Sequence, residues 1–124
     1  MSNSQSSKIT FDEMSQDFDS NKQILNPNSE AVVYITNRID TVFFDYISSI
    51  RSDIDYYVVI NTTNKVESEA KNIVFYNRPY ASDKSDSESW IYGLSKIKES
   101  NIKYKKISFC KRDGEISGVL HWSL

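Results

Sequence analysis

The most regular hydrophobic pattern lies near the middle of the chain. Two uninterrupted apolar runs, residues 31–36 and 56–61, are typical of strands that are covered on both faces. Residues 41–51, between them, begin a series of apolar side chains at helical spacing. The series consists of Phe43, Tyr46, Ile47, Ile50 and Ile54. Asp40 stands at the N-cap position, where its carboxylate can accept free N–H groups. The pattern predicts a strand, a helix and a second, parallel strand.

Two further elements are predicted on the C-terminal side of this unit. Residues 72–76 form a short apolar run that predicts a third strand. Ser85 and Glu88 form a capping box, which predicts a helix from there to about residue 100. Its expected apolar face consists of Trp90, Ile91, Leu94 and Ile97. The polar segment 62–71 fits either a loop or one helical turn.

The N-terminal part of the chain predicts one more helix. Residues 1–8 are rich in Ser, Asn and Gln, and we expect them to be flexible. Thr10 and Glu13 form a second capping-box pattern. We therefore predict a short helix over residues 11–18, with a weak extension toward Leu25.

The C-terminal residues predict a β-hairpin with a definite register. Asp113-Gly114 is a preferred pair for a two-residue type I′ turn, in which both residues need positive φ. The expected pairs are Phe109 with Gly118 and Ile107 with Leu120. This register gathers the apolar residues of both strands, continued by Ile116, on one face, and it leaves His121 on the solvent side.

Together these elements predict an α/β fold in a single small domain that covers residues 9–124. We expect a mixed sheet of about five strands with helices packed on it in two or three layers, an N-terminal helix and a C-terminal β-hairpin. The expected core includes Phe43, Ile47, Ile50, Val58 and Ile60.

The composition of the chain mainly excludes certain classes of function and kinds of site. The formal net charge of −2 lacks the Lys and Arg excess that a nucleic-acid binder needs. One cysteine and one histidine exclude a disulfide framework and an ordinary zinc site. Three glycines leave no phosphate-binding loop. The sequence shows neither a signal-peptide pattern nor an apolar run of roughly 18 residues. We therefore expect a cytoplasmic protein without a metal or cofactor.

Neither of the two candidate reactive side chains has the neighbours that catalysis requires. Cys110 lies on a predicted strand beside Lys111, which could lower its pKa, but we expect a half-buried structural thiol. His121 faces Lys106 in the predicted hairpin and has no adjacent acid or nucleophile. The sequence thus favours a binding protein over an enzyme.

Polar residues stand at the end of each of the first three predicted strands or directly after it. They are Asn37, Arg38, Asn61, Asn77 and Arg78. The ends of parallel strands meet at one edge of a sheet, where two guanidinium groups and several amides would suit a phosphate or carboxylate. The alternative interpretation is that the Asn residues form turns and that the arginines pair with Asp40 or Asp45 at the surface.

Residues 31–61 also resemble the opening strand, helix and strand of nucleotide-sugar glycosyltransferases. The chain is too short for the acceptor domain of that family, and we transfer none of its site residues. The resemblance keeps a nucleotide-binding domain or a minimal transferase-like enzyme among the alternatives.

Acidic and aromatic residues gather around the start of the last predicted helix. They are Tyr80, Asp83, Asp86, Glu88 and Tyr92. Tyrosines are frequent interface anchors, and carboxylates at an interface rim attract a basic partner. We therefore predict a protein-docking surface at these residues.

Two functional hypotheses follow from these patterns. The first is a small cytoplasmic protein-binding module, similar in type to the immunity proteins that neutralise bacterial toxins. The alternative is a small-molecule or nucleotide-binding domain, or a minimal enzyme, at the Asn/Arg edge. A deep pocket that contains both arginines would favour the alternative. A flat, aromatic surface with an acidic rim would favour the first.

Overall fold

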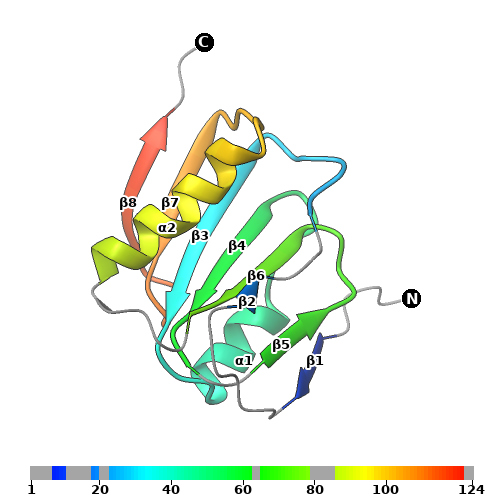
Figure 1. Ribbon diagram of the computed structural model, residues 1–124, viewed down its shortest axis with the longest axis vertical. Helices are drawn as coiled ribbons and strands as arrows, with labels where there is room; N and C mark the ends of the chain where they lie inside the picture. The colour runs from blue at the N-terminus through cyan, green and yellow to red at the C-terminus, as the bar shows by residue number, and fades with distance from the viewer. Residues whose placement is uncertain (1–6, 11–17, 20–22, 63–64, 79–85, 122–124) are drawn as a thin grey trace.

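The structure is a computed structural model that describes residues 7–10, 18–19, 23–62, 65–78 and 86–121. Its helices are α1 (Thr41–Ser48) and α2 (Asp86–Glu99). Its strands are β1 (Ser7–Thr10), β2 (Phe18–Asp19), β3 (Glu30–Thr36), β4 (Asp55–Ile60), β5 (Lys65–Ser68), β6 (Ile73–Asn77), β7 (Lys106–Cys110) and β8 (Ile116–His121) (Figure 1).

Six strands form one mixed sheet in the order β2-β6-β4-β3-β7-β8. The four inner strands β6, β4, β3 and β7 are parallel. At the two edges, β2 and β8 are antiparallel to their neighbours. β1 and β5 form a separate antiparallel pair. The predicted α/β fold with a mixed sheet is confirmed, and the five expected strands correspond to β3, β4, β6, β7 and β8.

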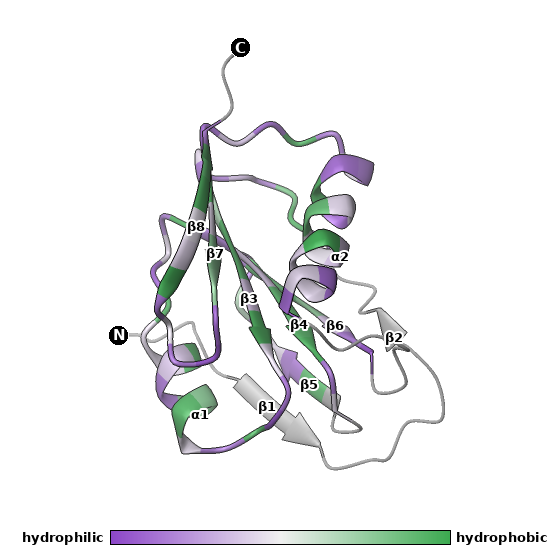
Figure 2. Ribbon diagram, turned by 90° about the vertical axis from the view of Figure 1, so that its left-hand side faces the viewer, coloured by the Kyte–Doolittle hydropathy of each residue, from purple (hydrophilic) through white to green (hydrophobic). Residues whose placement is uncertain are grey.

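The two helices lie on opposite faces of the sheet, which gives three layers (Figure 2). Successive residues of the inner strands alternate between the two faces. On β3, Val32 and Tyr34 join the hydrophobic cluster on the α1 face, whereas Val33 and Ile35 join the cluster on the α2 face. Both faces of these strands are therefore buried, which explains their uninterrupted apolar runs.

Most of the expected core is confirmed. Phe43, Ile47, Val58 and Ile60 are buried on the α1 face, and Ile50 is half-buried against the same cluster. Helix α1 ends at Ser48, three residues before the predicted end at residue 51. The Ser49 N–H and hydroxyl both donate to the carbonyl of Tyr46, at 3.0 and 2.9 Å, and this tightens the last turn.

The segment 62–71 was expected to be a loop or a helical turn, and both expectations were wrong. Residues Lys65–Ser68 form strand β5, which pairs with β1. Val66 is buried in the cluster on the α1 face. Because the partner strand lies more than fifty residues away in the sequence, a local pattern could not identify this strand.

The predicted N-terminal helix is not confirmed. Residues 11–17 lie outside the described residues. Phe18–Asp19 forms strand β2, which pairs with the end of β6. The predicted weak extension toward Leu25 is not present, because residues 23–25 are not helical.

The predicted register of the C-terminal hairpin is confirmed. The pairs are Phe109 with Gly118 and Ile107 with Leu120. His121 lies opposite Lys106 and is exposed, as expected. The register shifts beyond Phe109, so that Cys110 faces Ile116. Ile116 therefore shares the α1 face with Cys110 and does not continue the predicted apolar row.

The turn of this hairpin differs from the predicted type I′ turn. Gly114 has a φ of 84°, but Asp113 does not have a positive φ. The Lys111 N–H donates to the carbonyl of Glu115 at 3.2 Å, which closes a three-residue loop. Asp113 Oδ1 accepts the Glu115 N–H at 2.9 Å, a bond that favours this turn. Ser117 is then an extra residue on β8, and this bulge restores the predicted pairing.

The buried side of α2 also differs from the expected apolar face. The residues that face the sheet are Ser89, Gly93 and Ile97. A Cβ atom on Gly93 would lie 2.6 Å from Cγ1 of Val33, so the glycine allows the helix to approach the sheet closely. Ile97 is buried, and Trp90 and Leu94 pack half-buried against the cluster on the α2 face, as expected, but Ile91 is 60% exposed.

A buried polar network joins β3, β4 and β7 at their amino-terminal ends. Asp55, at the start of β4, is fully buried. Its Oδ2 accepts the Asn28 N–H at 2.9 Å and the Tyr104 hydroxyl at 2.7 Å, and its Oδ1 accepts Asn28 Nδ2 at 2.7 Å. The hydroxyls of Tyr104 and Tyr57 are 2.7 Å apart. Such bonds offset the desolvation of a buried carboxylate.

Among the described residues, no helix is both long enough and apolar enough to cross a membrane.

The close approach of α2 generates a first prediction. On an ordinary helix, Gly→Ala stabilises by up to about 1 kcal/mol. Gly93→Ala should instead destabilise by about 1–3 kcal/mol, because the new methyl group overlaps Val33. Urea denaturation of Gly93→Ala, Val33→Ala and the double variant measures this effect. The double variant should lose less than the sum of the single losses, and full additivity would contradict the proposed contact.

The buried tyrosines generate a second prediction. Burial raises the pKa of Tyr104, Tyr34 and Tyr46 above the ordinary value of 10.0. The folded state therefore favours the neutral phenol. The contribution of these tyrosines to the free energy of unfolding is complete below pH 10 and is lost as the pH rises above 10, where the tyrosines of the unfolded chain ionise. The free energy of unfolding should fall by up to about 1.4 kcal/mol per pH unit for each such tyrosine. Urea titrations above pH 10 should show a shallower fall for Tyr104→Phe, and an unchanged slope would contradict it.

Candidate functional site

The carboxyl ends of the parallel strands meet at one edge of the sheet, as predicted. The Asn61 N–H, just after β4, donates to the carbonyl of Thr36 on β3 at 2.9 Å. The Arg78 N–H, just after β6, donates to the carbonyl of Ile60 on β4 at 2.7 Å. The end of β7 joins this edge from the other side of β3.

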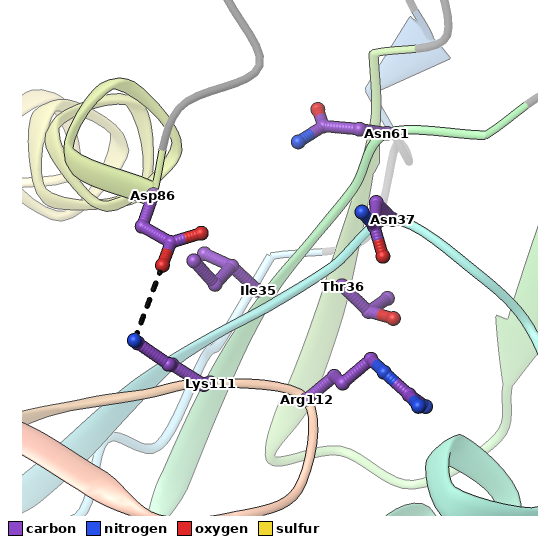
Figure 3. Close-up of a pocket in the computed structure, with 7 residues that line it drawn as sticks. All are labelled: Ile35, Thr36, Asn37, Asn61, Asp86, Lys111 and Arg112. Carbon is purple, nitrogen blue, oxygen red and sulfur yellow. Dashed lines mark ion pairs between the residues drawn. The ribbon is translucent and has the colours of Figure 1, made fainter.

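The connections diverge between β3 and β7. From β3 the chain passes through α1 to β4, whereas from β6 it passes through α2 to β7 on the other side of β3. Such a switch point is the usual place for ligands in open α/β sheets. A cavity of about 140 Å³ lies there (Figure 3). It is lined by Ile35, Thr36, Asn37, Asn61, Asp86, Lys111 and Arg112.

Each cation of this cavity has a carboxylate partner. Lys111 forms an ion pair with Asp86 at 3.5 Å. Arg112 points away from Asp86 (Figure 3), and its Nη1 bonds both oxygens of Asp40 at 2.9 and 2.8 Å. Asp40 is the N-cap of α1, as predicted, and its Oδ1 accepts the Phe43 N–H at 3.2 Å. The cavity therefore has no strong excess of positive charge.

Asn61 is a buried polar side chain of this cavity that has unused hydrogen-bonding capacity. The residue is 7% exposed, and its Nδ2 donates to the Ser89 hydroxyl on α2 at 2.8 Å. Its Oδ1 is buried and accepts no hydrogen bond from the residues that the structure describes. A buried acceptor of this kind can accept a hydrogen bond from a small bound molecule.

The five residues predicted for ligand binding divide into two groups. Asn37 and Asn61 line the cavity. Arg38 is exposed, and the guanidinium of Arg78 lies 4.2 Å from the centre of the Tyr92 ring. Asn77 is fully buried within β6. The two arginines therefore do not line this cavity.

The residues predicted for protein docking are only partly described. Tyr80 and Asp83 lie outside the described residues. Asp86 and Glu88 are exposed in the first turn of α2. Tyr92 is half-buried, and its ring packs edge-to-face on Tyr76 at 5.9 Å.

An apolar groove lies beside these carboxylates, between α2 and β7. Its volume is about 320 Å³. It is lined by Ser87, Trp90, Ile91, Leu94 and Phe109. Two contacts hold Trp90 there. Its Nε1–H donates to the carbonyl of Cys110 at 3.2 Å, and its ring packs edge-to-face on the ring of Phe109, with 6.2 Å between the ring centres. The groove thus has a rigid aromatic wall.

The groove and two residues of the cavity were not predicted from the sequence. Trp90, Ile91 and Leu94 were expected to face the core. Trp90 and Leu94 are half-buried against the cluster on the α2 face, as expected, whereas Ile91 is exposed. Lys111 and Arg112 follow β7, and they could have been found if the first hairpin strand had been recognised as a parallel neighbour of β3.

The remaining candidate groups show no reactive arrangement. Cys110 is buried, and burial raises the pKa of its thiol, which disfavours the reactive thiolate. His121 is exposed on β8. Within the described ranges, no three His, Cys, Asp or Glu side chains gather at a position that could hold a metal ion.

No protein-family model matches this sequence, and comparisons with curated proteins and with solved structures find no significant match.

Proposed function

We propose that this chain is a small protein-binding module that recognises a partner through the groove between α2 and β7. The observation that carries the proposal is the apolar groove beside the exposed carboxylates of Asp86 and Glu88. Ile91, at the groove, is 60% exposed. An apolar concavity with a polar rim is typical of protein interfaces.

The aromatic wall supports this proposal. Trp90 and Phe109 are held by a hydrogen bond and a ring contact, so they lose little conformational freedom when a partner binds. A partner that inserts an apolar side chain between Trp90 and Leu94 would bury surface that is now in contact with water. Preorganised aromatic residues of this kind are frequent hot spots of binding.

The acidic end of α2 supports a partner with basic residues. Asp86 and Glu88 lie in the first turn of α2, on either side of Ser87 in the sequence, and Ser87 lines the groove. Lys111 offsets part of the charge of Asp86. Exposed carboxylates at a rim mainly accelerate encounter with a cationic partner.

The partner class in this proposal is a protein that is neutralised by binding, as toxins are by immunity proteins in the cytoplasm. An inhibitor of this kind acts by occupying its partner's surface, and the exposed apolar groove near the carboxylates of α2 supports this mode of action. Identification of the partner from the native cells by affinity capture and mass spectrometry is the first step.

The groove generates a third prediction, tested by surface-binding kinetics with the captured partner. Ile91→Ala should accelerate dissociation about fivefold or more, because hot-spot truncations typically cost more than about 1 kcal/mol. Asp86→Asn with Glu88→Gln should instead slow association and weaken its salt dependence. Leu25→Ala is the matched control, since Leu25 is an aliphatic residue with 77% exposure that does not line the groove. Equal effects of Ile91→Ala and Leu25→Ala would contradict the proposal.

A second candidate function is the binding of a small molecule at the switch point between β3 and β7. The unused Oδ1 of buried Asn61 is the observation that favours it. The cavity of about 140 Å³ suits a small polar group with a hydrogen-bond donor, such as an amino acid or part of a nucleotide. Asn37, just after β3, and Lys111, just after β7, would also contact such a molecule.

The cavity generates a fourth prediction. A thermal-shift panel of amino acids, nucleotides and phosphates should contain a compound that raises Tm. The shift should be lost in Asn61→Ala and kept in Arg38→Ala, because Arg38 does not line the cavity. A shift of the same size in both variants, or none with any compound, would remove this second candidate.

A further inference from the structure

Strand β8 is an open edge of the main sheet (Figure 1). Within the described part of the chain, β8 pairs with β7 on one side and with no strand on the other. It contains no charged residue and no proline between Ile116 and Leu120. Most edge strands carry a charge, a proline or a cover that prevents pairing with another strand. The outer row of backbone N–H and C=O groups on β8 is therefore suited to a further strand.

The two faces of β8 are both apolar and both exposed. Ile116 and Val119 are 57% and 43% exposed, and they lie opposite Cys110 and Ser108 on the α1 face. Leu120 is 38% exposed and lies opposite Ile107 on the α2 face. A strand that pairs here must also be apolar on both faces to cover these side chains.

We propose that β8 pairs antiparallel with β8 of a second copy of this chain, so that two six-stranded sheets join into one. β8 itself has the properties that the pairing strand needs, because it is uncharged at its centre and apolar on both faces. The inference is independent of the proposed partner groove, which is lined by α2 and β7.

Charge at the ends of β8 favours the antiparallel arrangement. Glu115 precedes the strand, and at the other end His121 lies opposite Lys106. Antiparallel pairing brings Glu115 of one copy to the end of β8 where His121 of the other copy lies, with Lys106 one strand further on β7, at both ends of the contact. Parallel pairing would instead bring the two Glu115 carboxylates together at one end.

The same contact closes as a dimer and does not extend into a fibre. Within the described residues, the other edge of the sheet ends in β2, whose two residues offer a much shorter row of backbone groups than β8. A twofold axis relates the two β8 strands and leaves no further β8 edge open. One strand pair covers less than the roughly 800 Å² per partner of a standard interface, so we expect a dissociation constant on the order of micromolar or weaker.

Sedimentation velocity of the full chain, from about 1 µM to about 1 mM, tests the proposal. Wild type should change from monomer to dimer over this range. Val119→Lys and Val119→Glu should each stay monomeric, because Val119 is near the middle of the strand and becomes a diagonal neighbour of Val119 in the other copy when Glu115 lies opposite His121. An equimolar mixture of the two variants should restore the dimer by opposite-charge pairing, which a folding defect could not do.

Control measurements make each outcome decisive. Leu25→Lys places the same charge at a residue that is 77% exposed and should dimerise like wild type. Hydrogen exchange should show β8 amides that become protected as protein concentration rises. A wild type that is monomeric throughout would overturn the proposal, as would a dimer that survives Val119→Lys. Protection of β8 that appears only with a different protein would assign this edge to that protein and overturn self-pairing.

Discussion

The burial of Asp55 is the constraint on which the arrangement of the sheet depends. A carboxylate with no exposure is stable only where donors surround it, and here the donors come from Asn28 before β3 and from Tyr104 before β7. The network therefore fixes the starts of β3, β4 and β7 relative to one another. Because these strands are parallel, fixing their starts also fixes where their carboxyl ends meet, and the cavity at the switch point lies at those ends.

Local hydrophobic patterns predicted the elements in which every residue of a strand, or one whole face of a helix, is buried. The apolar runs of β3 and β4 and the helical spacing around Phe43 and Ile47 identified their elements, because both faces of the strands and one face of the helix are buried. Strand β5 was missed since Val66 is its one strongly apolar residue and its partner β1 is distant in sequence. Ile91 on α2 was expected to be buried but is exposed, because the hydrophobicity of a residue does not show how closely its helix approaches the sheet.

The candidate site was predictable only as far as strand ends determine it. Asn37 and Asn61 line the cavity because parallel neighbours end together. Arg78 was expected beside them, but its guanidinium lies on the ring of Tyr92, an attraction that depends on the position of α2. Lys111 and Arg112 reach the cavity because β7 lies next to β3, and this neighbourhood is set by long-range pairing.

The groove follows from the way α2 packs on the sheet. Ser89 and Gly93 are the small residues that face the sheet, and at Gly93 the helix lies too close to Val33 for a larger side chain to fit. Apart from Ile97, which is buried against the sheet, the large apolar side chains lie at the flank of the helix, where Trp90 reaches β7 and Ile91 stays exposed. Close packing at Gly93 and the exposed apolar surface at Ile91 are thus two results of one geometric constraint. A change that moved α2 away from the sheet would alter the shape of the groove together with the core.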